Sequence, residues 1–183
     1  MKILITGPQG SGKTTHAKIV AEKFNLCFIK TGDLVRNKAL ENSDEGRKLK
    51  EALDKGELAD DRIIANLVEN ALVQQNCKDN FVMDGYPRRL PQLQVFDPGF
   101  DKVFYLDLSD EMAVERMLKR SREDDTPQLI QQRLMLYHRE TEKALKYYQT
   151  MGILIKINAA RSIGEVAGDI VDHLKRHGNK YKD

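Results

Sequence analysis

The sequence has few cysteines. Only Cys27 and Cys77 occur, and they stand far apart in the chain. Neither belongs to a CxxC pair or a Cys/His cluster, so the sequence reveals no disulfide framework, zinc site or redox motif. We expect both to be buried free thiols.

Long apolar runs and segments of biased composition are also missing. The apolar start of the chain, residues 1–7, is too short for the core of a signal peptide, and no later run has the length to cross a bilayer. No tract is dominated by Gly, Ser, Pro or Gln. These absences predict a globular, cytoplasmic protein with no membrane partner.

The excess of charge of one sign is small. Thirty basic residues stand against 28 acidic ones, and a formal charge of +2 over 183 residues is too little for the polyanion-binding face of a nucleic-acid protein. A nucleic-acid partner is therefore not expected, and any anion must be bound locally. The length suits one compact domain over residues 1–183.

Short apolar segments alternate with helical patterns along the chain. These segments lie at Lys2–Thr6, Leu26–Ile29, Phe81–Met83, Val103–Leu108 and Ile153–Ile157. Strands that alternate with helices form a mostly parallel sheet, whose ligands bind beyond the carboxyl ends of the strands. We predict an α/β fold in which a five-stranded parallel sheet lies between two helical layers, a three-layer sandwich.

Two further patterns describe the rest of the chain. Residues 31–75 show helical periodicity but no convincing strand, which predicts a helical insertion over one edge of the sheet. Ser162 followed by Glu165 matches a capping box and predicts a last helix there. Residues 177–183 are expected to fray.

A glycine-rich loop follows the first expected strand. Residues 7–14 read GPQGSGKT, which matches GxxxxGK[ST] between a strand and a helix. Such a loop wraps its amides around phosphates at the positive end of the helix. We expect a nucleoside triphosphate on Gly10, Ser11 and Gly12, with Lys13 at its β and γ phosphates. The alternative is a plain connecting turn with a surface lysine.

Oxygen ligands near this loop suit magnesium. Thr14 or Thr15 can ligate Mg²⁺, a cation that keeps several waters and takes only one or two protein ligands. Asp84 ends an apolar run and is expected at the carboxyl edge of its strand, where it can orient a magnesium-bound water. The alternative for Asp84 is a turn-forming residue before Gly85.

Two arginines indicate a second phosphate site. Arg36 and Arg88 each follow an expected strand and therefore belong to the ligand side of the sheet. A guanidinium group meets phosphate oxygens in bidentate fashion and keeps its charge. Taken alone, an arginine after a strand is more often a solvated surface residue.

A third group of arginines belongs to the region after residue 109. Arg116 and Arg120 are four residues apart on one helix face, and Leu118 between them is expected on the buried side. Arg122 precedes an acidic segment, and Arg133 comes early in the next helix. The alternative is a charged helical hairpin in which these arginines pair with neighbouring acids.

These segments together resemble the adenylate kinase family of nucleoside monophosphate kinases, over nearly the whole chain. TGDLVR at 31–36 is similar to its monophosphate-binding segment, DGYPRRLPQ at 84–92 to its central signature, and GELAD at 56–60 to the turn over the acceptor base. The resemblance implies a P-loop NTPase-type fold with an NMP-binding insertion at about 31–75 and a short lid at about 120–126. It implies reversible, magnesium-dependent transfer of the γ-phosphoryl group of ATP to AMP, giving two ADP, by a monomer.

The resemblance also assigns roles to individual residues. AMP would contact Thr31, Gly32, Arg36, Ala59, Gly85, Arg88 and Gln92. ATP would contact Gly10, Ser11, Gly12, Lys13, Thr14, Thr15, Arg116 and Arg120, with Arg116 stacked on the base. The positive charge around the migrating phosphoryl group would come from Lys13, Arg88, Arg120, Arg122 and Arg133.

Two features depart from the family pattern. The segment between Arg120 and Asp124 holds only three residues and the cysteine-bearing long lid is absent, so zinc is not expected. Thr14 stands where adenylate kinases commonly have glycine.

Thr31 and Gln92 favour adenine over a pyrimidine. A UMP or CMP kinase of the same fold and a non-catalytic P-loop module that binds ATP are the alternatives.

Overall fold

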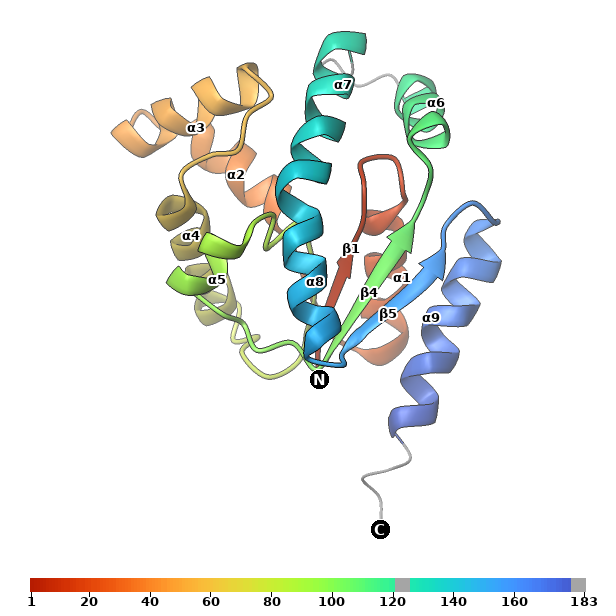
Figure 1. The fold of residues 1–183 in the computed structure, drawn as a ribbon. Coiled ribbons are helices and arrows are strands. Elements are labelled where there is room, and N and C mark those ends of the chain that lie inside the picture. Colours follow the sequence, from red (N-terminus) through yellow and green to blue (C-terminus); the bar gives the residue numbers. More distant parts are fainter. Residues whose placement is uncertain (121–125, 179–183) are drawn as a thin grey trace.

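A computed structural model describes residues 1–120 and 126–178 of the chain (Figure 1). Its sheet has five parallel strands in the order β2-β3-β1-β4-β5. The strands are β1 (Lys2–Thr6), β2 (Cys27–Lys30), β3 (Phe81–Asp84), β4 (Lys102–Asp107) and β5 (Leu154–Asn158). The predicted five-stranded parallel sheet is confirmed. Compared with the expected ranges, β2 and β5 lie one residue later, β4 lies one residue earlier and β3 extends one residue further.

Helices connect the strands and extend beyond their carboxyl ends, where α2, α3, α6 and α7 lie (Figure 1). The helices are α1 (Lys13–Phe24), α2 (Thr31–Ala39), α3 (Asp44–Asp54), α4 (Asp61–Gln74), α5 (Leu90–Val95), α6 (Asp110–Arg120), α7 (Pro127–Leu136), α8 (Glu142–Thr150) and α9 (Ile163–Gly178). A π-helical turn, η1 (Tyr137–Thr141), joins α7 to α8. Residues 31–74 thus form three helices and contain no strand, all of them within the described part of the chain.

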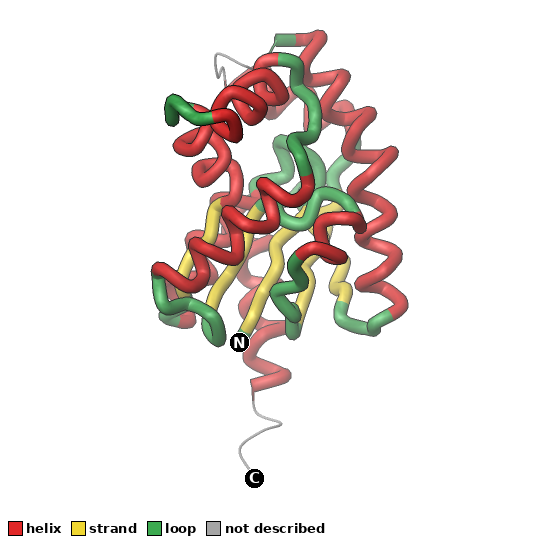
Figure 2. Tube along the Cα trace, turned by 90° about the vertical axis from the view of Figure 1, so that its left-hand side faces the viewer, coloured by secondary structure: helices red, strands yellow, loops and turns green. Residues whose placement is uncertain are grey.

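The sheet is buried on both faces, because successive residues of a strand point to opposite sides. Ile3 and Ile5 of β1 pack in one apolar core with residues of α1 and α9. Leu4, between them, packs in a second core with residues of α4 and with Tyr148 of α8. Figure 2 shows the strands with helices on both sides. The three-layer α/β sandwich predicted from the sequence is confirmed.

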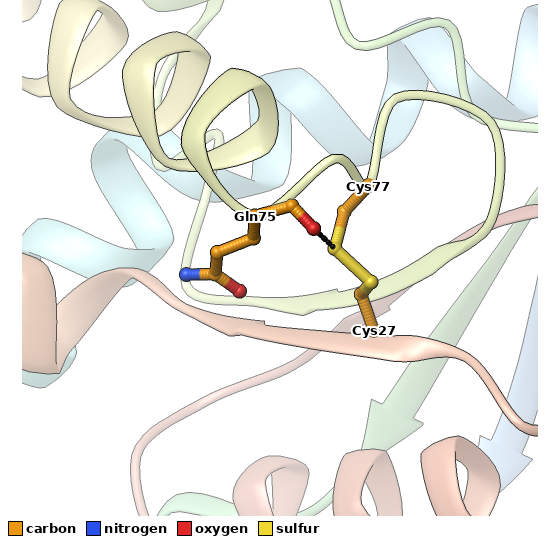
Figure 3. The surroundings of a disulfide bond; sticks show 3 residues. All are labelled: Cys27, Gln75 and Cys77. Carbon is orange, nitrogen blue, oxygen red and sulfur yellow. Dashed lines mark hydrogen bonds between the residues drawn. A yellow bond between two sulfur atoms is a disulfide. The ribbon is translucent and has the colours of Figure 1, made fainter.

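The expectation of two free thiols is wrong. Cys27, at the start of β2, and Cys77, between α4 and β3, form a disulfide with their Cα atoms 5.9 Å apart (Figure 3). They flank the helical residues 31–74, and β2 pairs with β3, so the fold brings the ends of this segment together. A separation of 50 residues in sequence gave no signal of this contact. The carbonyl oxygen of Gln75 lies 3.1 Å from Cys77 Sγ.

The last helix begins as predicted. The backbone N–H of Ser162 donates to Glu165 at 3.0 Å and the N–H of Glu165 donates to the Ser162 hydroxyl at 3.4 Å, which is a capping box. The helix α9 runs to Gly178, two residues into the segment expected to fray, and residues 179–183 lie outside the described part. None of the helices in residues 1–120 and 126–178 combines the length and the apolar character needed to cross a membrane.

Candidate active site

A cleft of about 330 Å³ opens beyond the carboxyl ends of the strands, where the alternating pattern predicted a ligand site. Its basic lining residues are Lys13, Lys30, Arg36, Arg88, Arg116, Arg120 and Arg133. Two acidic residues, Glu57 and Asp84, also line it. Positive and negative charges nearly balance over the whole chain, but the lining of this cleft has more basic than acidic side chains.

The loop between β1 and α1 forms one wall of this cleft. Gly10 has a φ of 83°, and a Cβ atom there would lie 2.7 Å from the carbonyl oxygen of Ala113, so only glycine fits. Gly12 has a φ of 87° and caps α1 in the left-handed conformation. Ser11 between them is buried. The loop therefore has the tight, glycine-dependent path that phosphate binding requires.

Lys13, the first residue of α1, folds back over this loop. Its ammonium donates to the carbonyl oxygens of Gly7 at 2.9 Å and Pro8 at 2.7 Å. Burial lowers the pKa of Lys13 to about 8, the positive charges of Arg88 and Arg120 act in the same direction, and Asp84 opposes them. An anion bound in the cleft would relieve this penalty, because it would pair with the ammonium.

The structure distinguishes the two threonines of the loop. The Thr14 hydroxyl donates to Asp84 Oδ2 at 2.5 Å, while Thr15 is exposed. Asp84 is the last residue of β3 and only 6% exposed, as its position after an apolar run predicted. Among the described residues there is no cluster of three or more His, Cys, Asp or Glu side chains arranged for a metal. The hard oxygens of Thr14 and Asp84 nevertheless fit the small ligand set that Mg²⁺ takes from a protein.

A smaller pocket of about 80 Å³ adjoins the cleft. Thr31 and Gln92 line it and are 3% and 2% exposed, although both side chains are polar. The Thr31 hydroxyl is buried without a partner among the described residues. Gln92 Oε1 accepts from the backbone N–H of Arg88 at 2.7 Å, so one of the two acceptor positions of the amide oxygen is in use. Ala59 also lines this pocket.

Arg36 and Arg88 lie where the cleft and the smaller pocket meet, since both line both hollows. Arg36 pairs with Asp33 in α2 at 2.5 Å, and Gly32 packs beside its guanidinium. Arg88 is exposed and lines the cleft, and desolvation by the surrounding protein lowers the pKa of its guanidinium. Asp84 opposes this shift, and the charges of Arg133 and Arg36 add to it. The repulsion among these cations favours a bound anion between them.

Three arginines of the third group lie in α6 and α7. Arg116 donates to the carbonyl oxygens of Ala159 at 2.9 Å and Ala160 at 3.4 Å. Arg120, at the end of α6, and Arg133, in α7, also line the cleft. Leu118 is 47% exposed, so the expectation that it lies on the buried side is wrong: it is turned away from buried Met117 by one helical step of about 100°. The prediction for Arg122 lies outside the described residues.

Two side chains of this region were not singled out by any sequence pattern. Thr141, at the end of the π-helical turn, donates to the Arg88 carbonyl oxygen at 2.9 Å. Arg89 donates to Asp61 Oδ1 at 2.6 Å. The repeated arginine at positions 88 and 89 was the only local signal for Arg89, whereas Thr141 had none. Thr141 thus contacts the backbone of Arg88, and Arg89 holds the residue next to Arg88 through its ion pair.

Comparisons with known proteins agree with this geometry. The family model described as adenylate kinase matches residues 5–153. The chain is 37% identical to an adenylate kinase of Bifidobacterium longum (strain NCC 2705), with 96% of the chain and 100% of that protein covered. It is 35% identical to adenylate kinase 1 of Nostoc sp. (strain PCC 7120), with 92% and 96% covered. It is 30% identical to an adenylate kinase of Francisella tularensis subsp. novicida (strain U112), with 96% and 100% covered. The chain belongs to the adenylate kinase family.

Proposed function

We propose that the cleft and its smaller pocket divide the two substrates of the adenylate kinase reaction between them. As a member of this family, the chain transfers the γ-phosphoryl group of ATP to AMP and gives two ADP. The loop of Gly10, Ser11, Gly12 and Lys13 would hold the triphosphate, and the pocket beside Thr31 and Gln92 would hold AMP. The observation that carries this assignment is the position of Arg36 and Arg88, which line both hollows.

The residues around this junction supply positive charge and alignment. The acceptor phosphate is already largely ionised at neutral pH, so the reaction needs no general base. Lys13 would follow the migrating phosphoryl group from one side and Arg88 from the other, and each would stabilise the charge of the transition state more strongly once water has left. Arg120, Arg122 and Arg133 would surround the same group.

The acceptor pocket would read the base through a small number of polar atoms. Gln92 Oε1 already accepts from the Arg88 backbone and keeps one acceptor position, whereas its NH₂ group has two donors, so the base edge would meet mainly the NH₂ group. The buried hydroxyl of Thr31 would gain a partner from the base. Gly32 and Gly85 would allow close approach of the nucleotide, and Ala59 would contribute a backbone group.

Magnesium belongs to this proposal as the partner of ATP. The Thr14 hydroxyl and, through a water, the Asp84 carboxylate would hold it, with Thr15 as the other candidate ligand. The ion would supply charge neutralisation between the phosphates of ATP. Arg116 would stack on the ATP base, held by the carbonyl oxygens of Ala159 and Ala160. No zinc takes part in this scheme.

The remaining parts of the proposal concern movement and location. The insertion at about 31–75 would close over AMP and the short lid at about 120–126 over ATP, so that water is excluded before transfer. We expect a cytoplasmic monomer that binds neither nucleic acid nor membrane. A lasting Cys27–Cys77 disulfide is uncommon in a reducing cytosol, so the redox state of the two cysteines in cell extracts tests the location.

An acceptor panel tests the substrate assignment. With ATP as donor and AMP, UMP, CMP or GMP as acceptor, we expect kcat/KM for AMP to exceed that for either pyrimidine nucleotide, because Thr31 and Gln92 present polar atoms to adenine. Activity confined to UMP or CMP would favour the related pyrimidine kinases. A protein that binds ATP but forms no ADP and ignores an analogue joining two adenosines through phosphates would be a P-loop binding module.

A further inference from the structure

An ion pair connects two chain segments that line the smaller pocket. Arg89 Nε donates to Asp61 Oδ1 at 2.6 Å, although the two residues are 28 positions apart in sequence. Arg89 immediately follows Arg88, and Asp61 is the first residue of α4. The contact therefore joins the segment before α5 to the start of the last helix of the insertion.

The same guanidinium has a second contact, with a residue that lines the pocket. Arg89 Nη2 donates to the carbonyl oxygen of Ala59 at 3.4 Å. The neighbouring carboxylate, Asp60, is used differently, because it accepts from the backbone N–H groups of Arg62 at 2.9 Å and Ile63 at 3.2 Å and so caps α4. Of these two adjacent acids, Asp60 organises the helix and Asp61 holds Arg89.

The contacts of Arg89 connect two chain segments that line the smaller pocket. Leu58 and Ala59 line it from the segment before α4, and Arg88 and Gln92 line it from the segment around the start of α5. Arg89 is not among the residues that line this pocket or the larger cleft, so a bound nucleotide would not touch it. Its effect on a ligand must pass through the positions of the two segments that it connects.

Both side chains of the Arg89–Asp61 ion pair are largely buried. The side chains of Arg89 and Asp61 are 30% and 19% exposed. By contrast, Arg47 and Asp44 of α3 form an ion pair in which the side chains are 65% and 85% exposed. Exposed pairs of the second kind contribute little, whereas removal of one partner from a sheltered pair leaves the other charge poorly compensated.

We propose that Arg89 and Asp61 are positioning residues for the acceptor nucleotide. They hold the turn at Ala59 at the correct distance from Arg88 and Gln92, so that the pocket is already shaped when AMP enters. The affinity for AMP then depends on the Arg89–Asp61 ion pair, whereas the affinity for ATP does not. This inference rests on the proposed function, since it takes the smaller pocket as the AMP site.

The test compares Arg89→Met, Asp61→Asn and the double variant with the wild-type enzyme. We expect each single variant to raise the KM and Kd for AMP about tenfold, with KM for ATP and kcat at saturating substrates within about twofold. The double variant should be little worse than either single one, because both changes break the same contact. Arg89→Lys, which keeps the charge but loses the fork, should fall between.

Arg47→Met is the matched control, because it makes the same substitution in an exposed ion pair of the same insertion. It should leave every constant unchanged. Unchanged KM and Kd for AMP in the Arg89 and Asp61 variants would overturn the inference. So would a parallel rise in KM for ATP and AMP with a lower unfolding midpoint, because that pattern marks a general loss of structure.

The reference variant Arg88→Ala separates this inference from the proposed function. If the smaller pocket is the AMP site, Arg88→Ala should lower kcat by at least about 100-fold while the protein stays folded. Full activity of Arg88→Ala would remove the proposed site and the inference with it. A strong loss in Arg88→Ala together with normal AMP binding in Arg89→Met would contradict the inference alone.

Discussion

At the scale of single residues, the site combines groups whose chemistry is altered by their neighbours. Lys13 is held by two carbonyl oxygens, and its pKa is lowered to about 8 because burial and two guanidinium groups disfavour its charge. Thr14 and Asp84 share a short hydrogen bond at the end of β3. An anion bound in the cleft would pair with the Lys13 ammonium, and this pairing would stabilise the folded protein.

The lowered pKa of Lys13 predicts that ATP binding depends on pH. The phosphates of ATP stabilise the ammonium and raise its pKa, so binding above about pH 8 must be accompanied by uptake of a proton. The Kd for ATP should therefore be nearly constant below pH 7 and rise by up to about tenfold per pH unit above pH 8. Calorimetry at pH 7, 8 and 9 in buffers of different ionisation enthalpy measures both quantities.

Lys13→Arg provides the control for this experiment, because a guanidinium group keeps its proton throughout the range. The variant should bind ATP more weakly but without proton uptake. If the wild-type protein takes up no proton between pH 8 and 9, the account of Lys13 is incorrect.

The residues that could be predicted from sequence are those whose signal is local. The glycine-dependent turn at residues 7–14 is encoded in its own spacing, and the place of Asp84 at the end of β3 is marked by the apolar run before it. Arg89 and Asp61 form a contact between segments 28 residues apart, and the position of Thr141 follows from a π-helical turn. Such contacts depend on tertiary packing, which periodicity does not encode.

At the scale of elements, the same distinction explains the fold. Alternating apolar segments predicted all five strands, because a strand buried on both faces is apolar whatever surrounds it. The disulfide of Cys27 and Cys77 could not be predicted, since it depends on β2 and β3 being neighbours and on α4 returning to the same edge. It closes the base of the segment that contains α2, α3 and α4.

The disulfide predicts a stability that depends on redox conditions. Closing a loop of 50 residues lowers the entropy of the unfolded chain, and this corresponds to about 4 kcal/mol in the free energy of unfolding. Urea unfolding of the oxidised protein, with and without reducing agent, measures the difference. Reduction should lower the unfolding midpoint, and hydrogen exchange should rise first in the helices of residues 31–74.

A double variant, Cys27→Ser with Cys77→Ser, serves as the control. Its unfolding midpoint should match that of the reduced protein and should not respond to reducing agent. Titration of thiols in the oxidised wild-type protein should find none. Equal midpoints before and after reduction would show that the cross-link does not stabilise the protein.

At the scale of the whole molecule, the parallel sheet explains how distant segments form one site. The carboxyl ends of its strands bring together the loop after β1, Asp84 of β3 and the helices that carry the arginines. The formal charge of the whole chain is only +2, but basic side chains far outnumber acidic ones in the lining of the cleft. The fold thus concentrates positive charge where two nucleotides would place their phosphates.

The central claim is that this cleft passes a phosphoryl group from ATP to AMP, and the fate of a labelled γ-phosphoryl group tests it most directly. When the protein is incubated with magnesium, γ-labelled ATP and AMP, we predict that the label appears in the β position of ADP and that two ADP form for each ATP consumed. Label found only in inorganic phosphate would contradict the account, and so would label that reaches UMP or CMP in parallel incubations but does not reach AMP.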